Sequence, residues 1–276
     1  MGRHLVCLTF DFDAWSGLVA RGLTSPTPVS RGEFGAMTVT ERLLPLLERY
    51  RLPSSWFVPG TVVETYPDHC RRIHAAGHEI GNHGYTHVPP ANLSPQAEEE
   101  GLLAASAAIE RITGDRPVGY RSPSWDLSAV TVDLLLRHGF DYDSSMMGHD
   151  HLPYFARRGD RVPEDGPIVF GETTQLVEIP VSWSLDDFPH FEFLRTQTSL
   201  MPGLMNAGLV LENFIADYDY MTRISDWGVL TYTFHPFVVG RGHRMLMLER
   251  LIHALMERGA VFCRLCDAVT EFRARA

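Results

Sequence analysis

Short apolar runs alternate with longer segments of helical periodicity along the chain. Each apolar run has roughly four to eight residues and ends at a polar residue or at a Pro-Gly pair, as buried strands do. Strands separated by helices favour parallel pairing with crossover connections, so the pattern predicts an α/β fold. The expected strands are Leu5–Phe10, Ser54–Val58, Val118–Arg121, Val177–Ser182, Val229–Phe234 and Ala260–Cys263.

Several helices are indicated by their end signals. The sequence Thr38–Glu41 fits a capping box, in which the threonine hydroxyl and the glutamate carboxylate satisfy free backbone amides. A helix over Ser94–Gly114 would start at a Ser-Pro pair and end at a glycine in a left-handed conformation. Further helices are expected over Ser128–His138 and Met245–Glu257.

The segment Ala14–Ala36 differs from the rest of the chain because it is rich in Gly, Ser, Pro and Thr. We expect a long loop there, and loops of this length are usually functional or disordered. It follows the first strand directly, so in an α/β barrel it would lie at the face that carries active sites. It could narrow its own site or, in a homo-oligomer, that of a neighbouring subunit.

Composition bounds the class of protein. The chain has 276 residues, 45% of them hydrophobic and 21% charged, so it is globular, and we expect one catalytic domain over residues 1–276. The net charge of −10 argues against nucleic acid and anionic membrane surfaces as partners. The first apolar run, Leu5–Phe10, is shorter than the roughly 7–15 residues of a signal-peptide core. We therefore expect a cytoplasmic protein.

The four cysteines add little to this picture. Cys263 and Cys266 form a lone C-x-x-C, and a zinc ribbon would need a second pair. A redox pair is one interpretation, and buried free thiols are the favoured one.

Two carboxylates follow the first strand. Asp11 and Asp13 are two residues apart, so on extended backbone their side chains point the same way. Carboxylates held that close need a cation or a proton between them. The alternative is a solvated turn or a pair of helix caps.

Histidines offer a partner for these acids. His83 and His87 are four residues apart, so one helical turn would place both imidazoles on one side. Two histidines and one carboxylate with open positions suit zinc or another divalent transition ion. The alternative is a chance pair of surface histidines.

Other polar residues follow later strands. Arg121 could orient a carboxylate through its planar fork, or it could be a surface residue beside a turn proline. His235 could serve as a general acid, or it could be a capping or core histidine. The acids Asp186 and Asp187 could line a pocket or form an acidic turn.

Four of these segments occur in an order that resembles the polysaccharide deacetylases, the NodB-type metal amide hydrolases. The matching segments are Thr9–Asp13, His83–His87, Arg121–Pro123 and Phe234–Pro236. The resemblance implies a distorted (β/α) barrel of about seven strands that uses a divalent metal, with zinc preferred. It implies that Asp13, His83 and His87 hold the metal, that Asp11 is the base and His235 the acid, and that Arg121 positions Asp11.

One departure affects the expected substrate. Phe12 separates the two acids, and this Asp-x-Asp form resembles a subgroup close to cofactor-independent allantoinases and cyclic imide hydrolases. We therefore expect a metal-dependent hydrolase that cleaves the carbon–nitrogen bond of a small amide, cyclic imide or ureide. The alternatives are an N-deacetylase of an N-acetylated sugar or peptidoglycan, and a catalytically dead binding protein on the same scaffold. The expected substrate contacts are Glu33, Tyr85, Trp125 and Asp187, with Phe188 and Phe191 as further apolar walls, and backbone amides near Tyr85 would help to hold the oxyanion.

Overall fold

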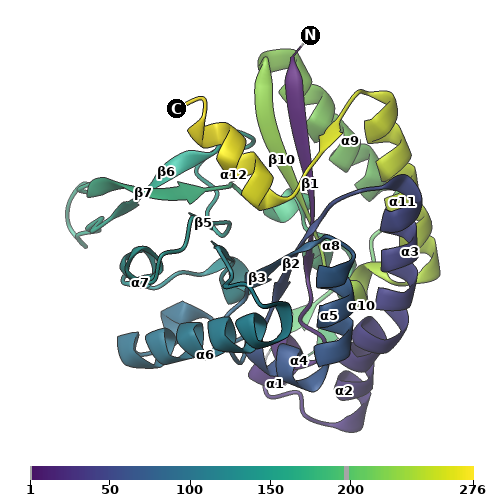
Figure 1. The fold of residues 1–276 in the computed structure, drawn as a ribbon, viewed down its shortest axis with the longest axis horizontal. Helices are drawn as coiled ribbons and strands as arrows, with labels where there is room; N and C mark the ends of the chain where they lie inside the picture. Colours follow the sequence, from purple (N-terminus) through teal and green to yellow (C-terminus); the bar gives the residue numbers. More distant parts are fainter. Residues whose placement is uncertain (1, 196–198) are drawn as a thin grey trace.

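The computed structural model describes residues 2–195 and 199–276, and its main feature is one curled, largely parallel sheet (Figure 1). The strand order is β10-β1-β2-β3-β4-β5-β7-β6, and every pair from β10 to β7 is parallel. The parallel strands are β1 (Arg3–Asp11), β2 (Ser55–Val58), β3 (Glu79–Asn82), β4 (Gly119–Tyr120), β5 (Tyr142–Asp143), β7 (Glu172–Glu178) and β10 (Trp227–Phe234). This curled sheet confirms the predicted distorted barrel.

Other short strands complete the sheet and its surroundings. The strand β6 (Tyr154–Arg158) pairs antiparallel with β7 at the sheet edge, and β11 (Val261–Phe262) pairs with β1. A separate hairpin joins β8 (Leu194–Arg195) and β9 (Leu200–Met201). An isolated parallel bridge links Asp186 to Thr233 in β10. The chain beyond β7 therefore runs alongside the edge of β10 that does not pair with β1.

The strand β1 lies at the centre of the fold. It pairs with β10 on one side and with β2 on the other, and its residues from Leu5 to Asp11 are buried. A parallel strand with both faces covered reads as a continuous apolar run, which is why the sequence reveals β1 and β10 clearly. The largest apolar cluster packs the outer side of these strands against α3 (Thr40–Tyr50), α9 (Ala207–Ile224) and α11 (Gly242–Glu257), which lie together in Figure 1.

The remaining helices follow the individual strands. Among them, α6 starts at Ser94, whose hydroxyl accepts from the Ala97 amide, and ends at Gly114 with φ +83°, as predicted. None of the described helices is both long and apolar enough to cross a bilayer. Their bounds are α4 (Gly60–Thr65), α5 (Pro67–Ala75), α6 (Pro95–Thr113), α7 (Thr131–Arg137), α8 (Asp187–Phe191), α10 (Pro236–Val239) and α12 (Leu265–Arg273).

The expected loop over Ala14–Ala36 is instead helical, so that prediction is wrong. It contains α1 (Ser16–Ala20) and α2 (Pro26–Glu33), and a π-helical turn, Phe34–Val39, joins α2 to α3. Proline in the first turn of α2 is compatible with a helix. Gly32 permits close packing, because a Cβ at this position would lie 2.4 Å from the Trp15 backbone. Thr38 therefore lies inside a continuous helix and does not cap one.

Candidate metal centre and active site

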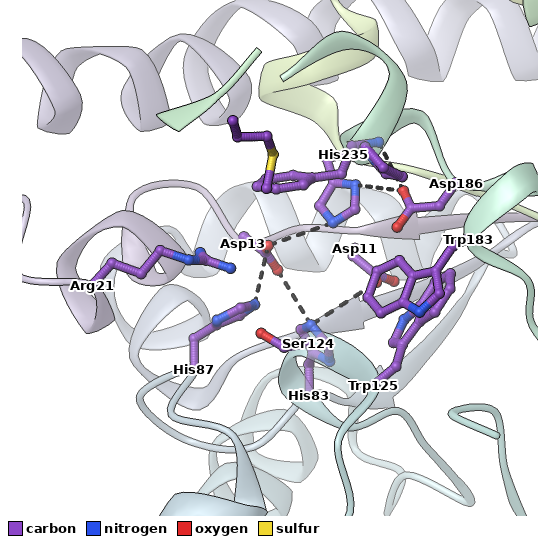
Figure 2. A pocket seen from close by; sticks show the side chains of 13 residues that line it. Asp11, Asp13, Arg21, His83, His87, Ser124, Trp125, Trp183, Asp186 and His235 are labelled. Atoms are coloured by element: carbon purple, nitrogen blue, oxygen red, sulfur yellow. Dashed lines mark hydrogen bonds and ion pairs between the residues drawn. The ribbon is translucent and has the colours of Figure 1, made fainter. Parts of the chain in front are cut away.

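The candidate site is a cavity of about 300 Å³ at the carboxyl ends of β1, β3 and β10 (Figure 2). Parallel strands gather their carboxyl-end residues at one face, so motifs far apart in sequence meet there. The lining residues are Asp11, Asp13, Arg21, His83, His87, Ser124, Trp125, Trp183, Asp186, Phe188, Pro189, Met201 and His235.

Asp13, His83 and His87 form one compact group. The Asp13 Oδ1 atom lies 3.4 Å from His83 Nε2, and Asp13 Oδ2 lies 3.1 Å from His87 Nε2. All three side chains are buried, and one donor atom from each lies within 4.8 Å of the others. The histidines do not share a helical turn as expected: the chain turns sharply after β3, with Gly84 at φ +67° and His87 at φ +62°. The turn brings the imidazoles together without a helix.

This group fits a divalent cation. His83 Nδ1 donates to the Arg121 carbonyl at 2.7 Å, so its Nε2 lone pair is free to face Asp13. Asp13 Oδ1 is buried and has no hydrogen-bond partner among the described residues. Burial alone would raise the pKa of Asp13, but the charges and hydrogen bonds of His87 and His83 hold it well below its usual range. An ionised carboxylate and two imidazoles are a donor set that zinc and similar ions accept.

Asp11 is fixed from behind by Arg121. The Arg121 Nη1 atom donates to Asp11 Oδ1 at 2.7 Å and to Thr9 Oγ1 at 2.8 Å. The same guanidinium donates to the backbone carbonyl and the hydroxyl of Ser144, each at 3.0 Å. Asp11 Oδ2 then faces the cavity, 4.0 Å from His83 Nε2. This carboxylate therefore has one oxygen anchored and one available.

His235 faces the group formed by Asp13, His83 and His87, and lies on the other side of Asp13 from the two histidines (Figure 2). Its Nδ1 atom lies 2.9 Å from Asp187 Oδ1 and 3.4 Å from Asp186 Oδ1, and its Nε2 atom lies 3.8 Å from Asp13 Oδ2. Burial alone would lower the pKa of His235, but the two carboxylates raise it well above its ordinary value. Burial also raises the pKa of Asp187 to about 7, with hydrogen bonds to His235 opposing the rise. A protonated His235 can therefore present Nε2–H to the cavity.

Two tryptophan side chains form another part of the cavity wall. Trp125 and Trp183 stack with ring centroids 4.3 Å apart, and Trp183 is 44% exposed. Both Ser124 and Trp125 have positive φ values, of 58° and 53°, which is uncommon for residues other than glycine. This strained turn aims the Trp125 ring at the cavity, beside the metal group.

Comparison with known proteins identifies the family. The sequence profile described as polysaccharide deacetylase matches residues 2–142. The chain is also 36% identical over 269 residues to a peptidoglycan deacetylase of Helicobacter pylori, covering 93% of this chain and 92% of that protein. This chain belongs to the polysaccharide deacetylase family. The resemblance carried by the four motifs is therefore confirmed. The family comprises hydrolases that act on carbon–nitrogen bonds.

Other relatives agree with this assignment. A peptidoglycan deacetylase-like protein of Gibberella zeae is 30% identical over 285 residues, covering 93% of this chain and 82% of that protein. A crystal structure from Mycobacterium smegmatis, of a protein assigned to the same family, is 31% identical, with a TM-score of 0.86 over 99% of this chain and 91% of that one. The Puue allantoinase, at 20% identity and a TM-score of 0.79 over 99% and 91% of the two chains, shares the fold.

Not every substrate contact expected for this deacetylase-family chain lies at the cavity. Trp125 does, but Glu33 is exposed on α2. The Tyr85 hydroxyl donates to Glu64 at 3.0 Å and its ring lines a neighbouring cavity. Asp187 is fully buried behind His235, and its neighbour Asp186 lines the cavity instead. Of the apolar walls, Phe188 lines the cavity and Phe191 is in the core.

Arg21 lines the cavity from the end of α1, although no pattern in the sequence predicts it there. Its surroundings gave no signal, since α1 has only five residues and shows no apolar period. Met201, on the β8–β9 hairpin, was also missed.

Proposed function

We propose that this protein is a metal-dependent N-deacetylase of an N-acetylated amino sugar or peptidoglycan fragment. The observation that carries the proposal is that Asp13, His83 and His87 face one point, with the free oxygen of Asp11 on one side and His235 Nε2 on another. Amide hydrolysis needs a base for water and an acid for the leaving nitrogen. The two groups stand on either side of the proposed metal ligands, as that reaction requires.

Each residue has a separate task in this proposal. Asp13, His83 and His87 hold the cation, which when bound supplies a Lewis acid for the carbonyl and makes water more acidic. Asp11 accepts the proton of the attacking water at Oδ2, because Oδ1 is occupied by Arg121. His235 donates the Nε2 proton to the departing nitrogen, while Asp186 and Asp187 hold its other nitrogen. An amide nitrogen leaves poorly as an anion, so this proton is essential.

The sugar substrate is supported by the relatives, since those that match nearly the whole chain are named as peptidoglycan deacetylases. The stacked Trp125–Trp183 pair adds an apolar surface beside the metal group, of the kind that packs against a ring face. A second candidate, a small cyclic imide or ureide, is favoured by the size of the cavity. About 300 Å³ lies at the small end of ligand sites and suits a compact molecule better than a polymer strand.

Turnover assays test both candidates. Zinc-reconstituted protein is incubated with N-acetylglucosamine oligomers, peptidoglycan fragments, and a set of hydantoins, cyclic imides and ureides. Release of acetate from the sugars would support the first candidate, and ring opening alone would support the second. The variant Asp13→Asn serves as the inactive control. A protein that binds one of these compounds in calorimetry yet turns over none would instead be a binding protein.

A further inference from the structure

Arg21 faces the cavity from the side opposite the tryptophan pair. Figure 2 shows its side chain extending from α1 towards Asp13 and His87, with Trp125 and Trp183 on the far side. Its Nη1 atom donates to the Gly17 carbonyl at 2.8 Å, a contact within its own short helix. Among the described residues, no carboxylate lies within ion-pair distance of this guanidinium. The cavity therefore contains a guanidinium whose other N–H groups are available to a ligand.

Arg21 and His87 both lie close to Gly17. A Cβ on Gly17 would lie 3.2 Å from His87 Cε1 and 3.4 Å from Arg21 Nη1. The imidazole of the proposed metal ligand and the guanidinium thus meet above the same glycine. The Phe188 ring, 5.6 Å from the Arg21 Cζ atom, borders the guanidinium on another side. A ligand atom that approached the metal group would come within reach of Arg21.

From these contacts we propose that Arg21 binds a carboxylate of the substrate, so that the preferred substrates are amides with an anionic substituent. This inference rests on the proposed function for its reaction. A guanidinium presents a planar fork that matches a carboxylate in two parallel hydrogen bonds. The acids of this cavity are already engaged, Asp11 by Arg121, Asp13 by the two histidines, and Asp186 by His235 and the Phe188 amide. The ligand itself would supply the missing counter-charge.

The opposite wall defines the other end of the ligand. Trp125 and Trp183 would pack against the apolar face of a ring, while Arg21 holds the carboxylate and the scissile amide lies between them over Asp13. An N-acylated sugar acid or a cyclic amide with a carboxymethyl arm has this arrangement of groups. A neutral sugar or an unsubstituted ring lacks the anionic end.

Matched pairs of compounds test this assignment by calorimetry. One pair is N-acetylmuramic acid and N-acetylglucosamine, and the other is hydantoin-5-acetic acid and its neutral amide. At least one acid is expected to bind about tenfold more tightly than its neutral partner, the gain typical of a charge-assisted hydrogen bond. The variant Arg21→Gln should abolish this preference, and Arg21→Lys should restore part of it. Arg49→Gln, an exposed arginine paired with Glu249, is the matched control and should keep it.

A metal ion could also bind a carboxylate directly, so the titrations are repeated with metal-free protein. Three results would overturn the assignment. The wild type could show no preference for the acid in either pair, the preference could persist in Arg21→Gln, or it could vanish when the metal is removed. Binding is measured separately from turnover, so the two proposals can fail separately. If the wild type hydrolyses none of the compounds yet still binds the acids more tightly, the proposed function is contradicted and Arg21 remains an anion-binding residue.

Discussion

Arg121 Nη1 donates to Asp11 Oδ1 at 2.7 Å, and neither side chain has more than 2% of its surface exposed. The arginine is itself held by Ser144 and Thr9, and its guanidinium lies 4.3 Å from the Phe57 ring centroid. A buried ion pair is stabilising only when its hydrogen bonds are complete. Four of the five guanidinium N–H groups have an acceptor among the described residues, and the pair leaves the second oxygen of Asp11 facing the cavity.

The first prediction concerns this pair. Arg121→Lys keeps the charge but cannot supply the fork, so the two Ser144 acceptors lose their donor. We expect the free energy of unfolding to fall by about 2–4 kcal/mol, the cost of buried groups left unsatisfied. Urea denaturation followed by circular dichroism measures it. The control Arg137→Lys alters an arginine that is 60% exposed and should change stability by about 0.5 kcal/mol or less. Equal stability of the two variants would contradict this account.

The second prediction concerns metal binding. Asp13→Asn and His87→Ala each remove one proposed ligand and should lower the bound metal to a small fraction of the wild-type content. Elemental analysis of purified protein gives the metal content, and circular dichroism checks that the fold is retained. Asp68→Asn, a carboxylate that is 88% exposed, should bind metal as the wild type does. Full metal occupancy in either ligand variant would show that the assignment is wrong.

The third prediction separates the base from the ligands. Asp11→Asn retains an oxygen for Arg121 but cannot accept a proton, so metal content should stay near the wild-type value. The rate of hydrolysis should fall by roughly 10²–10⁴, the usual contribution of a general base. Steady-state kinetics on whichever amide the wild type hydrolyses provides the measurement. If Asp11→Asn loses metal as fully as Asp13→Asn, then Asp11 is a ligand and the assignment of the base fails.

The fourth prediction uses His78, which directly precedes β3, is buried and is hydrogen-bonded to Ser54 Oγ at 3.0 Å. Burial lowers the pKa of His78 to about 4, whereas in the unfolded chain it is about 6.5. Between pH 4 and about 6.5, His78 is therefore protonated in the unfolded chain but neutral in the folded protein. The free energy of unfolding consequently falls as the pH drops through this range. His78→Asn should lose less stability on acidification than the wild type, as measured by urea denaturation at several pH values. His243→Asn, at an exposed position, should follow the wild-type curve.

The sequence predicted β1, β2 and β10 from their continuous apolar runs and missed β3, which polar contacts hold in the sheet. The strand β3 reads Glu-Ile-Gly-Asn, which shows neither an apolar run nor an alternation. It is nevertheless fully within the sheet because Glu79 accepts from Ser55 and Tyr142, and Asn82 donates to Leu102 and Ser106. Such partners come from distant segments, so no local pattern reveals them.

The sequence predicts those site residues that stand at the end of a recognisable strand. It does not predict those whose position depends on contacts with distant segments. Asp11 is the last residue of an evident strand and Asp13 follows it, and both residues line the cavity. Asp186 and Asp187 are adjacent in sequence, and only the bridge between Asp186 and Thr233 determines that Asp186 lines the cavity while Asp187 lies behind His235. The role of Arg21 depends on the close approach of α1 to His87 above Gly17.

The pairing of β1 with β10 also has a consequence for biosynthesis. Thr9 and its partner Thr233 are 224 residues apart, whereas the proposed metal ligands Asp13, His83 and His87 all emerge early in translation. At roughly 5–20 residues per second, the ribosome would present those ligands for about 7–30 s before β10 is made. During that interval β1 exposes an unpaired apolar edge, which is a target for chaperones and for aggregation. The residues of the candidate metal centre would thus leave the ribosome well before His235 does.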